Sequence, residues 1–127
     1  MIRATLILSA IYLIAIGAGL MFFPFQFGVG AIPADASPEL IALLRLLGGP
    51  FLGIAALNLM TRNSPPGAAL HPVLVANLIG FGAVAANDII GVATGHSRDL
   101  AKYFLIAHLL FAGAFALAIR VNLKGQP

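Results

Sequence analysis

The chain has 127 residues, of which 61% are hydrophobic and 9% are charged, and its mean hydropathy is +1.03. These values lie far outside those of soluble proteins and indicate that the fold is built in lipid. The absence of cysteine excludes thiol and disulfide oxidoreductases, thiolate metal sites and iron–sulfur clusters. The formal charge of +3 comes from Lys and Arg residues scattered at the ends of apolar runs, which argues against a nucleic-acid-binding patch.

Four apolar runs follow one another along the chain. They predict helices over residues 4–23, 40–60, 70–92 and 100–119. Each run is about 20 residues long, the length that crosses the hydrocarbon core of a bilayer. The breaks between the runs are short and rich in Pro, Gly and Asn, so successive helices should be antiparallel neighbours. The sequence therefore predicts an all-α, membrane-spanning four-helix bundle with up-down topology, in which residues 1–127 form a single transmembrane domain.

Two of the predicted helices have a recognisable start. Ser37 is an N-cap candidate followed by Pro38 at the first helical position and Glu39 in the first turn. Ser97 with Asp99 repeats this pattern before the last run. We therefore expect the second and fourth helices to begin at these two caps.

The basic residues predict the orientation of the chain. Arg3, Arg62, Arg120 and Lys124 lie at one end of the predicted helices. The other end has a first loop with acidic residues and no Lys or Arg, and a second loop of mixed charge. The positive-inside rule then places both termini in the cytoplasm of a cell with the protein in its inner (plasma) membrane.

Two opposite charges lie inside the second and third helices. Arg45 is about eight residues beyond Ser37 and Asp88 about nine before Ser97, so both lie about 12 to 13 Å from the outer helix ends. An unpaired charge at this depth costs at least about 2.5 to 3.5 kcal/mol. We therefore expect Arg45 and Asp88 to contact each other. His108, about 16 Å along the fourth helix, lies at a similar depth and can complete a triad.

Further residues extend this polar cluster and the helix-packing surface. Asn77, Asn87 and Tyr12 are polar groups inside the apolar runs. Gly49 and Gly53 share a helical face with Arg45 and form a GxxxG pattern, and Gly91 lies on the stripe of Asp88. The cluster either fixes the register of the helices or handles a ligand or a proton, and the glycines are expected to serve helix packing.

Metal, cofactor and catalytic sites are not indicated. His71, His96 and His108 fall at different levels of the predicted bundle, so no pair of them is placed to hold a metal ion or a haem. No Ser, His, Asp arrangement and no phosphate-binding glycine loop occurs. We therefore expect a protein that is not an enzyme and has no cofactor.

The second helix carries a family resemblance. The segment LLRLLGG, with Arg45 followed by Gly48, Gly49 and Gly53, resembles small bacterial four-helix membrane proteins of the broad DoxX-like type, whose members are mostly uncharacterised. The resemblance is diffuse, covers most of the chain and implies the fold but no catalytic residue. Small multidrug exporters have a similar size, but they need an acidic residue in the first helix, and none is present here.

Three functions fit these features. The first is a non-enzymatic interaction or accessory subunit that binds a membrane protein partner or a second copy of the chain. The second is a binding protein for a small amphipathic molecule, a quinone or a lipid, whose polar head lies at the intramembrane cluster. The third is an oligomeric proton or ion pathway in which Asp88 and His108 are relay groups.

Overall fold

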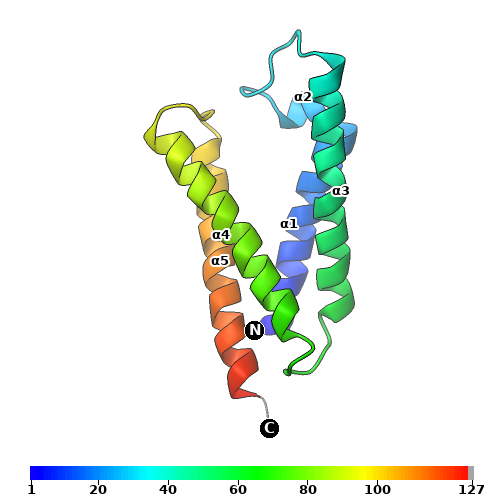
Figure 1. Cartoon of the computed structure of the whole chain (residues 1–127), viewed down its shortest axis with the longest axis vertical. Coiled ribbons are helices and arrows are strands. Elements are labelled where there is room, and N and C mark those ends of the chain that lie inside the picture. The colour runs from blue at the N-terminus through cyan, green and yellow to red at the C-terminus, as the bar shows by residue number, and fades with distance from the viewer. Residues whose placement is uncertain (126–127) are drawn as a thin grey trace. The chain divides into compact units, whose positions relative to one another are not determined.

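The computed structural model describes residues 1–125, and all regular structure in this range is helical. The helices are α1 (Ile2–Phe22), α2 (Pro24–Phe27), α3 (Pro38–Thr61), α4 (His71–Ala93) and α5 (Ala101–Lys124) (Figure 1). All except α2 are long and apolar enough to cross a membrane. The predicted all-α fold class and its four membrane-length helices are therefore confirmed.

Helical structure follows from the solvent that these sequences require. Lipid offers no hydrogen-bond partners to the backbone. A helix satisfies its backbone amides and carbonyls with hydrogen bonds inside one segment. The start of α3 is fixed by Ser37, whose Oγ accepts a hydrogen bond from the Leu40 amide at 3.3 Å. The Ser37 carbonyl also accepts from the Ile41 amide at 3.1 Å. The predicted N-cap is thus confirmed, and α3 continues through Pro50.

The N-cap predicted at Ser97 is wrong, although the predicted start of the last helix at residue 100 is within one residue of the observed start. α5 begins at Ala101, with Leu100 as an N-cap residue that makes no side-chain hydrogen bond. The Ala101 amide donates to the Arg98 carbonyl at 2.9 Å, so the residues after Ser97 form a separate turn before the helix. At its other end α5 extends to Lys124 rather than to residue 119, because polar residues lower the hydropathy there without interrupting the backbone hydrogen bonds.

The short helix α2 was not predicted. Its Phe27 ring lies against Gly19 of α1, where an added Cβ would come within 2.5 Å of a ring carbon. α2 therefore folds back on the last turns of α1. Gly30, which has a φ of 79°, follows and turns the chain into the connection that leads to α3.

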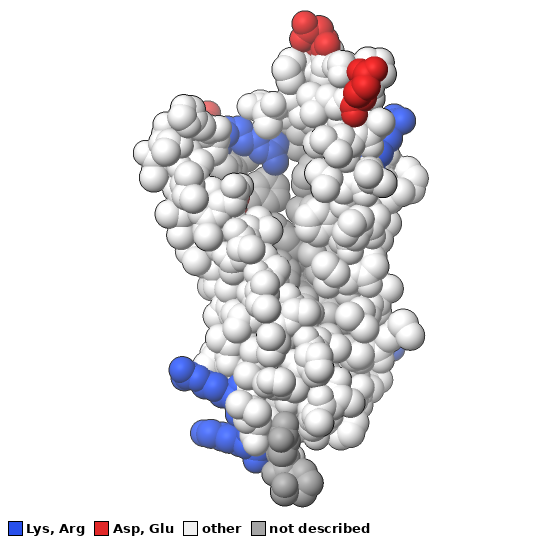
Figure 2. Space-filling view, in the orientation of Figure 1, with Lys and Arg blue, Asp and Glu red and all other residues white. Residues whose placement is uncertain are grey.

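The chain divides into two compact units. Unit 1 contains Met1–Leu6 and the chain from Thr61 onward, and therefore α4 and α5, which lie side by side (Figure 1). Unit 2 is Ile7–Met60, which holds most of α1 and α3. The single-domain organisation stays a prediction. Most of the length of the helices is uncharged, and the charged side chains visible in Figure 2 lie toward the helix ends.

Each unit has its own contacts between helices. In unit 2, Ser9 near the start of α1 meets Asn58 near the end of α3, while Gly17 meets Gly48. In unit 1, Phe81 of α4 stacks on Phe115 of α5, with 5.8 Å between the ring centroids. Phe115 is fully buried.

Candidate functional site

The candidate site is the pair formed by Asp88 of α4 and His108 of α5. Asp88 lies five residues before the end of α4 at Ala93, and His108 lies seven residues after the start of α5 at Ala101. At 1.5 Å per residue, these positions are about 7.5 Å and about 10.5 Å from neighbouring helix ends. Both residues therefore lie nearer to their helix ends than the sequence had suggested, and their depths still differ by about 3 Å, as expected.

The two side chains are in direct contact. His108 Nδ1 lies 2.5 Å from Asp88 Oδ2, and the exposed fractions of the two side chains are 11% and 16%. Both groups are largely shielded from solvent, so each would lack a hydrogen-bond partner without the other. The contact therefore stabilises both side chains. The pair thus joins α4 to α5 within their apolar stretches.

Aromatic rings surround the imidazole. The centroids of the Phe81 and Phe104 rings lie 6.2 and 6.4 Å from that of His108. Phe111 stacks on Phe81 with 4.8 Å between centroids, and the Arg98 guanidinium lies 5.1 Å from the centre of the Phe104 ring. The site is therefore a polar pair set among flat apolar surfaces, with a cation on the ring nearest the loop.

This arrangement has a defined hydrogen-bonding chemistry. A carboxylate that accepts a hydrogen bond from Nδ1 fixes the tautomer of a neutral imidazole and orients its ring. Nε2 of such an imidazole is a hydrogen-bond acceptor and a base. The pair can therefore bind a hydroxyl group or exchange a proton with one.

The other polar residues singled out in the sequence have different surroundings. Asn77 is buried, and its Nδ2 donates to the Val73 carbonyl of its own helix at 2.9 Å. Asn87 is exposed, and Tyr12 is half-buried. Tyr12 and Arg45 belong to unit 2, and the contact of Arg45 with Asp88 stays a prediction.

The close approach of helices in unit 2 is made by other glycines than those expected. A Cβ on Gly48 of α3 would lie 2.5 Å from the Gly17 carbonyl oxygen of α1. A Cβ on Gly49 or Gly53 would meet no atom within 4 Å, whereas one on Gly91 would lie 3.2 Å from Cβ of Ser97. Gly91 therefore packs against the loop that follows α4, while the surface at Gly49 and Gly53 is open.

Two asparagines that the sequence reasoning missed make hydrogen bonds between segments. Asn58 donates to Ser9 Oγ at 3.0 Å, and both residues are fully buried. Asn122 accepts from the Gly67 amide at 2.8 Å and donates to the Gly67 carbonyl at 3.1 Å. For Asn58, its place inside a long apolar run was the available signal, since such residues commonly join membrane helices.

The described residues offer no ready-made metal site. No group of three or more His, Cys, Asp or Glu side chains gathers among residues 1–125. The Asp88–His108 pair brings a carboxylate and a basic side chain within hydrogen-bond distance. Comparison of the chain with protein-family models, with curated proteins and with solved structures gives no match.

Proposed function

We propose that the chain is a non-enzymatic multi-pass membrane protein that acts as an interaction or accessory subunit. The observation that carries this proposal is that polar side chains in its membrane-length helices make hydrogen bonds between helices. Asp88 and His108 join α4 to α5, and Ser9 and Asn58 join α1 to α3. Polar side chains committed to helix–helix contacts support a structural role for them.

A surface of α3 supports the interaction role. Arg45, Gly49 and Gly53 lie four residues apart on one helical face, Arg45 is exposed, and the space above both glycines is open. Small residues let a second membrane helix approach closely. Arg45, about 10 Å from the start of α3, needs an anionic group at its own level. The partner proposed here is a transmembrane helix with a carboxylate at that level.

Site-specific photo-crosslinking tests this proposal. A crosslinking amino acid at Gly53 should capture a membrane segment that carries an Asp or Glu, and Arg45→Gln should abolish the capture. The matched control is the same amino acid at Gly80 of α4, which is exposed and has equally open space. Capture of lipid alone would overturn the proposal. Capture of the chain's own Asp88 segment would establish the internal Arg45–Asp88 pair instead.

A second candidate function is binding of an amphipathic molecule, a quinone or a lipid, at the Asp88–His108 pair. The rings of Phe81 and Phe104 beside the imidazole favour it, because aromatic faces and a few convergent polar groups are typical of such sites. Native mass spectrometry of the detergent-purified protein tests it. A small molecule retained by the wild type and lost from Asp88→Asn would support binding, and a bare chain in both cases would exclude it.

The same pair favours a third candidate, an oligomeric proton or ion pathway, because a carboxylate and an imidazole in contact can pass a proton. Flux measurements in liposomes separate this candidate from the other two. A proton or ion flux that Asp88→Asn abolishes would support the pathway. Equal flux in protein-containing and empty liposomes would exclude it.

The proposed location is the inner membrane of a bacterium, with up-down topology and both termini in the cytoplasm. Its support is the four membrane-length helices found among the described residues and the position of Arg3, Arg62, Arg120 and Lys124 at the termini and in the α3–α4 connection. The resemblance of the Arg45 segment to DoxX-like proteins supports the bacterial assignment.

A further inference from the structure

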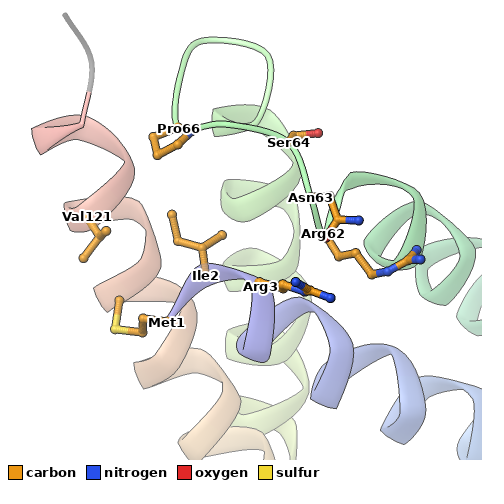
Figure 3. A pocket seen from close by; sticks show the side chains of 8 residues that line it. All are labelled: Met1, Ile2, Arg3, Arg62, Asn63, Ser64, Pro66 and Val121. Atoms are coloured by element: carbon orange, nitrogen blue, oxygen red, sulfur yellow. The ribbon is translucent and has the colours of Figure 1, made fainter.

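A pocket of about 400 Å³ opens in unit 1, at the end where α4 begins and α5 ends. Three segments far apart in the sequence line it: the first residues of α1, the connection between α3 and α4, and Val121 of α5 (Figure 3). The connection is held in place, because the Ser64 amide donates to the Thr61 carbonyl at 2.9 Å and Asn122 makes both of its hydrogen bonds to Gly67. The pocket is thus formed before any ligand binds.

The polar side of this pocket consists of hydrogen-bond donors suited to an anion. Arg3 and Arg62 both line it, together with Asn63 and Ser64, and Figure 3 shows the side chains of Arg3 and Arg62 extending in the same direction. Guanidinium groups match the oxygens of a phosphate, and two neighbouring guanidinium groups can donate to the same phosphate.

The charged residues that line the pocket, Arg3 and Arg62, are both basic. None of the residues that line it is Asp or Glu. On α4, which begins beside the pocket, the first acidic residue is Asp88. It lies 17 residues from the helix start at His71, or about 25 Å along the axis. Two further cations, Arg120 and Lys124, lie in the last two turns of α5. This end of unit 1 therefore attracts anions.

The other side of the pocket is apolar, and its position is that of a membrane surface. Ile2 and Val121 line it beside the arginines. Arg3 lies in the first turn of α1 and Arg62 directly follows α3, so both lie at the ends of membrane-length helices, where lipid headgroups are found. A ligand with a phosphate and an adjoining apolar part fits both sides, which favours a lipid over a free phosphate.

We propose that this pocket is a binding site for the phosphate of an anionic phospholipid. The guanidinium groups of Arg3 and Arg62 bind the phosphate, Asn63 and Ser64 donate to its remaining oxygens or to the headgroup, and Ile2 and Val121 contact the start of the acyl chains. The site is separate from the Asp88–His108 pair and does not depend on the accessory role of α3.

Native mass spectrometry of the full chain, released from nanodiscs that contain equal amounts of phosphatidylglycerol and phosphatidylcholine, tests the proposal. The wild type should retain phosphatidylglycerol in preference to phosphatidylcholine. The Arg3→Gln/Arg62→Gln variant should bind it more weakly by about tenfold or more, because each charge-assisted hydrogen bond contributes on that scale. The matched control is Arg120→Gln/Lys124→Gln, which removes the same charge at the same end and should retain the lipid.

Three results would overturn the proposal. Equal loss of lipid in the control variant would show a general effect of charge, and equal retention of the two lipids by the wild type would show no selectivity. Binding of inorganic phosphate that competes with phosphatidylglycerol at equal concentration would assign the pocket to a soluble phosphate. Arg3→Lys/Arg62→Lys guards against misfolding of the glutamine variant, since it keeps the charge and should retain part of the selectivity.

Discussion

His108 Nδ1 and Asp88 Oδ2 lie 2.5 Å apart and connect α5 to α4, in side chains that are both largely covered. Removing either partner leaves the other without its hydrogen bond in an apolar environment. We expect Asp88→Ala and His108→Ala each to lower the free energy of unfolding by about 1–3 kcal/mol. Equilibrium unfolding in mixed detergent micelles measures these changes.

A double-mutant cycle isolates the contact itself. The double variant should lose less than the sum of the two single losses, by about 0.5–2 kcal/mol. Asp99→Ala is the control, because Asp99 is exposed in the loop before α5 and should change stability little. Strictly additive losses at Asp88 and His108 would contradict a stabilising pair.

The glycines of α3 give a second prediction. A Cβ on Gly48 would lie 2.5 Å from the backbone oxygen of Gly17, and backbone cannot move aside as a side chain can. Gly48→Ala should therefore lower the free energy of unfolding by about 1–3 kcal/mol. Gly49→Ala is the neighbouring control, and it should be neutral or stabilising by up to about 1 kcal/mol, because alanine favours the helix. Equal effects at the two positions would show that α1 does not pack at Gly48.

These two adjacent glycines also show what the sequence alone could predict of the fold. Hydropathy and caps predicted four membrane-length helices and the start of α3 at Ser37, because these depend on local chemistry. Gly48 and Gly49 point about 100° apart on one helix, and the GxxxG pattern pointed to the face of Gly49 and Gly53. Which face of α3 packs against α1 depends also on the side chains of α1. A pattern within α3 alone does not include that information.

The candidate site was predictable to a similar degree. A charge and an imidazole inside apolar helices were recognised as a cluster, and the structure brings Asp88 and His108 together. The depth of His108 was overestimated, because the residues after Ser97 form a turn closed by the Ala101 amide and the Arg98 carbonyl. The Ser97 and Asp99 pattern is compatible with such a turn as well as with a helix start. Asn122 was missed because it lies beyond the predicted end of its helix.

Asn122 carries the third prediction. Its side chain is fully buried and makes two hydrogen bonds to Gly67, at 2.8 and 3.1 Å. Asn122→Ala should cost about 1–2 kcal/mol of stability and release the α3–α4 connection from α5. Limited proteolysis should then cut residues 62–70 faster than in the wild type. The exposed Asn63 provides the control variant Asn63→Ala, whose cleavage rate should match the wild type; faster cleavage in both variants would contradict a specific role for Asn122.

The fourth prediction concerns orientation. Arg120 and Lys124 at the end of α5, with Arg3 and Arg62, should hold both termini in the cytoplasm. A fluorescent protein fused after the last residue should therefore fluoresce in a bacterial host. Alkaline phosphatase fused in the loop after α4, near Ser97, should be active, because that enzyme needs the oxidising side of the membrane to form its disulfides.

A charge-redistribution variant tests the cause of this orientation. Arg120→Gln/Lys124→Gln combined with lysines inserted into the loop between α2 and α3 should raise the share of inverted chains, because basic residues in short loops resist translocation. If the wild type itself showed an active phosphatase at its terminus, the orientation would be the reverse of the one proposed. The pocket of Arg3 and Arg62 would then face the outer leaflet, and the phosphatidylglycerol it binds would have to come from there.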